Sequence, residues 1–265
     1  MKKKKNTLLW KVSGKPLKNP SYLFGTMHVK DLRAFQQRAL VHEKIDECEA
    51  FATEFSLDEM KLNTSENLMD LPEGMFLSEL IPAKAYKKIG KLFASLTGMD
   101  LILFDRSLPM LISNMLSEGV LSSDMPHSLD ESLWEYAREQ DKILLGIESF
   151  EEQIEILQKI PLDYQVKSLI WTAKNVHRFQ KQLLKMTRLY ETADLRKLYK
   201  AARKNAKGLR KVLLFDRNKV MAERFALIAK EQSICYAVGA GHLGGKKGLL
   251  RLLKKEGFKI TPVYK

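Results

Sequence analysis

Tyr22-Leu-Phe-Gly-Thr-Met-His28 is an apolar, strand-like run that reaches a glycine and carries a histidine three residues later. A stretch near the other end of the chain, Tyr236-Ala-Val-Gly-Ala-Gly-His242, has the same form, and a helical pattern follows each. A glycine tolerates positive φ, so the chain can turn sharply there. Open α/β sheets keep their ligand sites at the carboxyl ends of their strands. The two stretches therefore predict an α/β fold in which His28 and His242 share a metal or catalytic centre.

The composition fits a folded protein with a sizeable core. Of the 265 residues, 45% are hydrophobic and 29% are charged. No apolar run approaches the roughly 20 residues of a transmembrane helix. The basic start of the chain leads into a segment that is too short, and too interrupted by Lys11, for a signal-peptide core. Only Cys48 and Cys235 are present, which fits a reducing compartment. We therefore expect a cytoplasmic protein.

The net charge of +13 raises the question of a nucleic-acid partner. The lysines are spread along helical segments, and no nucleic-acid motif occurs. Aromatic residues are not interleaved with the basic runs, as a single-strand platform requires. The pattern disfavours nucleic acid and indicates a solvated cationic surface that favours acidic partners.

The order of elements predicts one α/β domain over residues 1–265. The first two strands form a hairpin, and most later strands are preceded by helices, so the central sheet should be mixed or mostly parallel. A helical lobe is expected from about 57–127 and 149–230. The expected strands cover residues 7–14, 21–27, 50–55, 143–148, 233–238 and 258–264, and the other expected helices cover residues 31–46, 128–140 and 247–256.

Two carboxylates stand where expected strands end. Glu54 closes the strand that should lie beside the one carrying His28, and Glu148 closes another strand at the same edge. A catalytic metal of the zinc type needs about three protein ligands and an open position. Histidine and carboxylate groups together suit Zn²⁺, Mn²⁺, Fe or Co. Glu54 is therefore a candidate ligand or general base and Glu148 a second choice, although either could simply stabilise a helix N-terminus.

Arg217 lies in a helical pattern that leads to the second histidine strand. A guanidinium beside a metal could hold a substrate carboxylate or stabilise an oxyanion. The alternative is a salt bridge on a charged helix.

Other chemistries are poorly supported. The chain has no Gly-x-Ser-x-Gly elbow, no Walker-type loop and no His-Glu-x-x-His. Residues 239–244 fit Gly-x-Gly-x-x-Gly, but the next strand ends at Lys265 without the acid that a dinucleotide ribose requires.

Five blocks of the sequence, in order, resemble the TraB/GumN family, which is related to the Tiki proteins of animals. The resemblance covers nearly the whole chain, and its most characteristic feature is the pair of Gly-x-x-His motifs. The blocks are Trp10-Lys-Val-Ser-Gly with Ser21-Tyr-Leu-Phe-Gly-Thr-Met-His28, Thr53-Glu54-Phe, Gly146-Ile-Glu-Ser-Phe-Glu-Glu-Gln153, Leu214-Phe-Asp-Arg-Asn218, and Val238-Gly-Ala-Gly-His-Leu-Gly-Gly245.

The resemblance implies a fold like that of the erythromycin esterase and ChaN-like proteins, with a helical lobe. It also implies a metal-dependent hydrolase, because Tiki proteins act as metalloproteases that prefer Mn²⁺ or Co²⁺. Transferred by position, it makes His28 and His242 metal ligands or catalytic residues. The further site candidates that it implies are Glu54, Glu148, Arg217 and Asn218.

These observations favour a metallohydrolase in which metal-activated water attacks the carbonyl of a peptide or small-molecule substrate. The divalent metal would be Mn²⁺ or Co²⁺, with Zn²⁺ as a further candidate. Two alternatives stay open: a non-catalytic protein that binds a peptide or small ligand in the same cleft, and a cationic protein acting on acidic polymers or membrane surfaces. The helices of residues 149–230 could serve a homodimer, although their Leu and Met stripes are more typical of a core.

Overall fold

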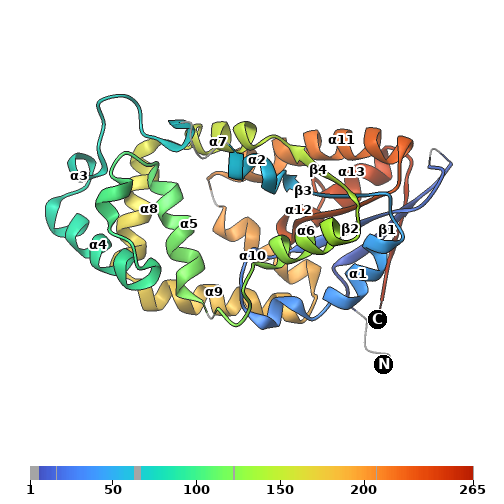
Figure 1. Ribbon diagram of the computed structural model, residues 1–265, viewed down its shortest axis with the longest axis horizontal. Helices are drawn as coiled ribbons and strands as arrows, with labels where there is room; N and C mark the ends of the chain where they lie inside the picture. The colour runs from blue at the N-terminus through green and yellow to red at the C-terminus, as the bar shows by residue number, and fades with distance from the viewer. Residues whose placement is uncertain (1–5, 16, 63–66, 122, 207, 265) are drawn as a thin grey trace. The chain divides into compact units, whose positions relative to one another are not determined.

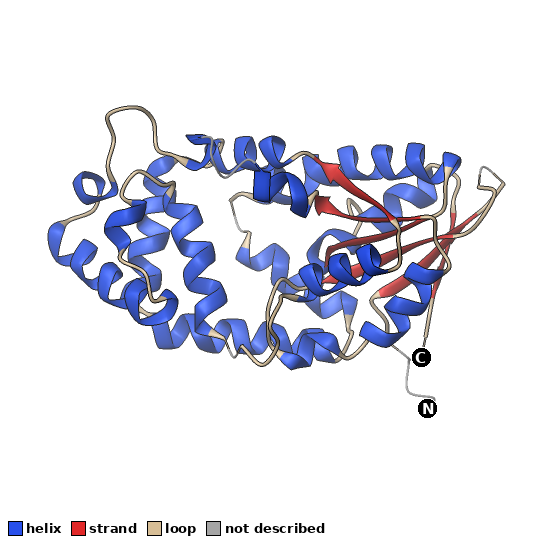
Figure 2. Cartoon of the chain, viewed as in Figure 1, coloured by secondary structure: helices blue, strands red, loops and turns tan. Residues whose placement is uncertain are grey.

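The computed structural model describes residues 6–15, 17–62, 67–121, 123–206 and 208–264. Within them, six strands form one sheet in the order β4-β3-β5-β2-β1-β6. Figure 2 draws the strands of this sheet in red. Neighbouring strands run parallel except where β1 pairs with β2 and with β6. The predicted α/β fold with a mixed, mostly parallel sheet is confirmed. The strands are β1 Leu9–Ser13, β2 Ser21–Thr26, β3 Ala50–Phe55, β4 Ile143–Glu148, β5 Ile234–Gly239 and β6 Lys259–Pro262.

The two Gly-x-x-His strands are direct neighbours at the centre of the sheet. Gly25 on β2 pairs with Val238 on β5, and Thr26 pairs with Gly239. Every residue of β2 is buried, and so is nearly all of β5, which is typical of strands covered on both faces. The sequence prediction that β3 lies beside β2 is wrong, because β5 separates them. The continuous apolar run of β5 gives it the central place.

Helices cover both faces of the sheet (Figure 1). On one face lie α1 Arg38–Asp46 and α6 Leu129–Glu139, where Trp134 packs edge-on against Phe51 of β3. On the other face lie α11 Arg217–Glu231 and α13 Leu249–Lys255, and Phe225 stacks on Tyr236 of β5. The stripe that α11 buries recurs at helical spacing and presents Met221, Ala222, Phe225, Ala226 and Ala229 to the sheet.

The helix expected over residues 31–46 is divided in two. A 3-10 helix, η1 Leu32–Phe35, precedes α1, and Asp31 caps it by accepting the Arg33 N–H. The division has a packing reason, because the apolar residues of this segment do not share one stripe. Separate helices bury Ala34 and Phe35 in the first part and Val41 and Ile45 in the second.

The described chain contains two compact units. The sheet unit comprises Met1–Lys61, Asp124–Phe150 and Met186–Lys265, and the helical unit comprises Leu62–Ser123 and Glu151–Lys185. The core of the helical unit is built by α4 Ala83–Thr97, α5 Pro109–Val120 and α8 Leu162–Lys174. The remaining helices are α2 Leu57–Leu62, η3 Asn67–Met69, α3 Leu77–Leu80, η4 Leu101–Phe104, α7 Phe150–Gln158, α9 Val176–Glu191, α10 Leu195–Asn205, the π-helical η5 Lys211–Asp216 and α12 Ala240–Leu243.

The helical unit is smaller than the predicted lobe of residues 57–127 and 149–230. Helices α10 and α11 belong to the sheet unit, because α11 packs its apolar stripe on the strands. A single catalytic domain over residues 1–265 therefore stays a prediction. Among the described residues, no helix combines the length and the apolar character needed to cross a bilayer.

Candidate active site

Three charged side chains meet at the carboxyl edge of the sheet. Glu54 stands near the end of β3 and Glu148 at the end of the adjacent β4, and Arg217 begins α11. Arg217 Nη2 donates to Glu54 Oε2 at 2.5 Å and to Glu148 Oε2 at 2.6 Å, while Nε donates to Glu148 Oε1 at 3.1 Å. The side chain of Arg217 is 10% exposed and that of Glu148 only 3%. The structure thus brings together Glu54, Glu148 and Arg217, three of the residues that the sequence predicts for the site.

The ion-pair network sets the charge of this edge. Burial alone would raise the pKa of Glu54, but Arg217, His242 and the Gly239 amide outweigh it and hold the pKa at about 2. Burial alone would lower the pKa of Arg217, and Glu54 and Glu148 raise it instead. Glu54 and Arg217 are therefore both charged at neutral pH.

The glycines of the two motifs act by leaving room for neighbouring atoms. The Gly239 N–H donates to Glu54 Oε1 at 2.9 Å, and a Cβ at Gly239 would lie only 3.1 Å from that oxygen. A Cβ at Gly25 would lie 2.7 Å from Leu243 Cδ1. The expected positive φ is wrong for both: Gly239 has φ −49°, and Gly25 is not among the described glycines with positive φ.

The tautomer of His242 is fixed by a hydrogen bond to Asn218. It lies in α12, and its Nδ1 is 2.6 Å from Asn218 Oδ1. Because Asn218 Nδ2 donates to the Lys247 carbonyl at 2.7 Å, Oδ1 is the atom that faces the ring. An amide oxygen only accepts, so His242 Nδ1 must carry the proton and Nε2 is left with a free lone pair.

That lone pair faces the carboxylate of Glu54. His242 Nε2 lies 3.9 Å from Glu54 Oε1. Burial lowers the pKa of His242 to about 4, against the opposing effect of Glu54, so the ring is neutral at neutral pH. Neither His242 Nε2 nor Glu54 Oε1 carries a hydrogen, so the two acceptors face each other without a hydrogen bond between them.

His28 is placed differently. It follows β2, its side chain is 52% exposed, and its Nδ1 lies 3.5 Å from Asp130 Oδ2. Asp130 also accepts from Thr26 Oγ1 at 2.6 Å. Asp130 was outside the predicted site residues. Its only signal in the sequence was a position in the first turn of α6, after the Ser128–Glu131 capping box, which is present as expected.

The donor set fits a divalent cation in part. Imidazole nitrogen and carboxylate oxygen bind Zn²⁺ at roughly 2.0–2.2 Å, so His242 Nε2 and Glu54 Oε1, 3.9 Å apart, are spaced widely enough to bind one ion between them. Asn218 supports His242 as the outer hydrogen-bond partner that metal-binding histidines typically have. Over the described residues, no group of three or more His, Cys, Asp or Glu side chains is close enough to hold a metal.

Known proteins resemble this chain over almost its whole length. The model of the TraB/PrgY/gumN family matches residues 8–262. A "Metalloprotease TIKI homolog" of Nematostella vectensis is 24% identical over 97% of this chain and 67% of its own length. "Metalloprotease TIKI2" of Xenopus tropicalis and "Metalloprotease TIKI1" of Homo sapiens are each 25% identical over 96% of this chain, which spans 59% and 61% of their lengths. No solved structure gives a significant match.

Proposed function

The chain belongs to the TraB/PrgY/gumN family, and on that premise we propose that it is a metal-dependent hydrolase of the metalloprotease type. Its substrate would be a peptide or a small molecule with an ester or amide carbonyl. The observation that carries the proposal is the pair of acceptors at the sheet edge, His242 Nε2 and Glu54 Oε1, which face each other at 3.9 Å. The metalloprotease names of the similar Tiki proteins point in the same direction.

In this proposal His242 and Glu54 hold the metal. The paired Gly-x-x-His motifs make His28 the candidate third ligand, and its exposed side chain would have to turn from Asp130 toward the ion to complete the set. A bound divalent metal supplies a water of lowered pKa and polarises the substrate carbonyl. The resemblance to Tiki proteins favours Mn²⁺ or Co²⁺, and a mixed nitrogen and oxygen donor set is compatible with both and with Zn²⁺.

Glu54 is better suited to be a ligand than a general base. An efficient base has a pKa near the working pH, whereas the pKa of Glu54 is about 2. An ionised carboxylate held by Arg217 and by the Gly239 amide is well oriented for a cation.

Arg217 acts first as a positioning residue, because its Nε and Nη2 groups are engaged by Glu54 and Glu148. The proposed oxyanion contact would therefore come from Nη1. Asn218 Oδ1 accepts a hydrogen bond from His242 Nδ1–H, which leaves the lone pair of Nε2 available for the metal. Glu148, which is 3% exposed, positions Arg217 and is a weaker candidate for a metal ligand than Glu54.

A non-catalytic binding protein is the second candidate function. It is favoured by the closed pairing of Arg217 with both acids, because a guanidinium already held by two carboxylates can fix the strand ends without taking part in any reaction. A cytoplasmic location and a homodimer are further proposals, and they rest on the sequence alone.

The test is metal binding by the purified full chain. Mn²⁺ binding is followed by loss of the free-ion electron paramagnetic resonance signal, and Co²⁺ and Zn²⁺ content by mass spectrometry after chelation and add-back. We expect about one ion per chain, lost in His242→Ala, His28→Ala and Glu54→Gln. His177→Ala, in the exposed part of α9, is the matched control and should bind normally.

A screen with fluorogenic peptides then separates the two candidates. Metal binding with cleavage that the same variants abolish supports the hydrolase. Stoichiometric metal without cleavage of any peptide or ester favours the binding protein. A wild-type chain that takes up none of the three ions would contradict the metal site itself.

A further inference from the structure

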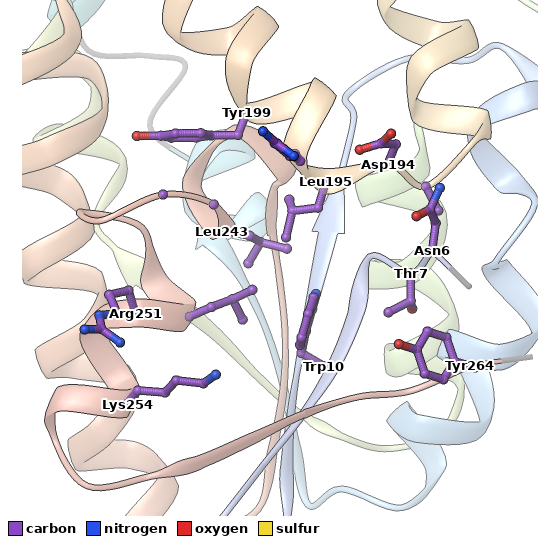
Figure 3. A pocket seen from close by; sticks show the side chains of 15 residues that line it. Asn6, Thr7, Trp10, Asp194, Leu195, Tyr199, Leu243, Arg251, Lys254 and Tyr264 are labelled. Atoms are coloured by element: carbon purple, nitrogen blue, oxygen red, sulfur yellow. The ribbon is translucent and has the colours of Figure 1, made fainter. Parts of the chain in front are cut away.

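A pocket of about 790 Å³ lies at the β1 and β6 end of the sheet unit. Its volume falls within the range of about 300–1,000 Å³ that ligand sites occupy. None of its lining residues is one of the predicted site residues, because Glu54 and Glu148 stand on β3 and β4, across β5 and β2. Figure 3 shows Trp10 in its middle, with Arg251 and Lys254 on one side and Thr7 and Tyr264 on the other.

The pocket has more positive than negative charge. Three cations line it, namely Arg196 from α10 and Arg251 and Lys254 from α13. Within the described residues, no hydrogen-bond or ion-pair partner is found for these three side chains. The lining acid, Asp194, already pairs with Lys197 at 3.0 Å and caps α10. Unpartnered cations around one concavity attract an anion and can bind its oxygens directly.

The pocket also offers a flat apolar wall. Trp10 lies on β1, and Leu195, Leu250 and Tyr264 surround the same space. The indole N–H of Trp10 is buried and has no hydrogen-bond partner among the described residues. The part of the Trp10 ring that reaches the pocket is therefore apolar carbon, and this wall favours a planar apolar group.

The remaining wall is formed by the backbone of Gly244 and Gly245, which have no side chains. At Gly245, φ is +86° and a Cβ would lie 2.2 Å from the ring of Tyr199. The Tyr199 ring therefore lies directly on the Gly244–Gly245 backbone. This segment follows His242 and Leu243 in the chain, so the pocket wall continues the second Gly-x-x-His motif.

We propose that this pocket is a binding site for a small organic anion. The anionic group, a carboxylate or a phosphate, binds to Arg196, Arg251 and Lys254. The planar apolar part of the molecule lies against Trp10 and Leu250. The site is independent of the proposed hydrolysis, since none of its residues belongs to the Glu54–Arg217–Glu148 network.

The test uses two dyes that differ in charge. Anilinonaphthalene sulfonate carries an anionic group on a planar apolar body, and N-phenylnaphthylamine has the same body without the charge. Each is titrated into the purified full chain, and the change in dye fluorescence is followed. We expect saturable binding of the sulfonate dye at one site per chain and markedly weaker binding of the neutral dye.

Charge reversal then locates the site. Arg251→Glu and Lys254→Glu should each weaken binding of the sulfonate dye by about tenfold or more, as expected for the loss of a charge-assisted contact. Lys255→Glu is the matched control, because it lies next to Lys254 on α13, is exposed and does not line the pocket. Its affinity should stay within about twofold of the wild type.

Three results would overturn the proposal: equal weakening by Lys254→Glu and Lys255→Glu, which indicates general surface charge; unchanged binding in all variants; or equal affinity for the two dyes. Displacement of the dye by phenyl phosphate or by benzoate identifies which anionic group, phosphate or carboxylate, binds to the three cations. Failure of both to displace the dye at millimolar concentration would be a fourth result against the proposal.

Discussion

At the scale of single residues, Asn218 decides which nitrogen of His242 carries the proton. Its amide is fixed by the bond from Nδ2 to the Lys247 carbonyl, so only the oxygen can face the ring. Replacing Asn218 with Asp puts a negative charge beside Nδ1 and favours the imidazolium form. We predict that Asn218→Asp raises the pKa of His242 from about 4 toward or above its ordinary value.

Long-range ¹H–¹⁵N spectra recorded against pH measure both the pKa and the tautomer of each histidine. His42, whose pKa is lowered by burial, lies on α1 on the opposite face of the sheet and serves as an internal reference that the substitution should leave unchanged. An unchanged His242 titration in the variant would show that Asn218 does not control the ring.

Arg217 is the residue whose removal should change the sign of the pH dependence of stability. In the wild type the pKa of Glu54 lies at about 2, below its ordinary value of 4.5. Its contribution to the free energy of unfolding is therefore present above pH 4.5 and is lost as the pH falls toward 2. In Arg217→Met, the buried carboxylate of Glu148 and the partly buried carboxylate of Glu54 face each other without a cation, so their pKa values rise above the ordinary value.

We predict that Arg217→Met lowers the free energy of unfolding by about 3–5 kcal/mol at pH 7.5. The loss should shrink as the pH falls to 5, because protonation relieves the buried charge. Urea unfolding at several pH values measures both effects. Arg138→Met is the surface control: Arg138 pairs with Asp58 and Glu135 but is 40% exposed, so it should cost about 1 kcal/mol or less with no change of slope. A parallel pH dependence in wild type and Arg217→Met would contradict the account.

The sequence predicts the residues of this edge better than their partners. Glu54 and Glu148 were identified because acids at the ends of parallel strands meet at one edge, and the structure brings them together through Arg217. The pairing of His28 with Asp130 could not be foreseen. It depends on where α6 begins in space relative to β2, and the spacing of residues along the chain does not encode that.

At the scale of elements, Gly25 shows that a motif glycine can be required for packing alone. Residues of α12 approach β2 so closely that a Cβ at Gly25 would lie 2.7 Å from Leu243 Cδ1 and 3.1 Å from Ala240 Cα. We predict that Gly25→Ala destabilises the sheet unit by about 1–3 kcal/mol, because an overpacked core must shift.

Gly90→Ala is the matched control within α4. A Cβ there meets Leu101 at an ordinary 3.9 Å, so the gain in helix propensity should stabilise the helical unit by about 0.5–1 kcal/mol. Amide hydrogen exchange, read separately for the two units, measures both changes. Equal and small effects of the two substitutions would show that the contact at Gly25 relaxes without cost.

The elements themselves follow from local pattern, whereas their order does not. Periodicity and capping predicted the six strands and the capping box of α6, because those signals act over a few neighbouring residues. The place of β5 between β2 and β3 is decided by which apolar strands are buried on both faces. That choice is global, and several strand orders satisfy the same pattern.

At the scale of the whole molecule, the chain has a separate hydrophobic core in each unit. The sheet unit buries a core that includes Phe225, and the helical unit buries one that includes Ile112; the two residues are each 0% exposed. We predict that Ile112→Ala lowers hydrogen-exchange protection in α4, α5 and α8 and leaves the sheet unit nearly unchanged. Phe225→Ala should have the opposite pattern, weakening the strands and α11. Deletions of this size cost about 2–5 kcal/mol, far above the error of such a measurement.

Separate cores allow the units to open at different free energies, as contiguous cooperative groups of elements often do. If each substitution instead lowers protection equally in every element, the chain unfolds as one cooperative body, and the predicted single domain over residues 1–265 gains support. If the effects stay within their own units, the helical unit is a module that can change stability without disturbing Glu54, Arg217 and His242. Loss of stability in the helical unit would then leave metal binding intact. Metal binding by the Ile112→Ala protein measures this directly.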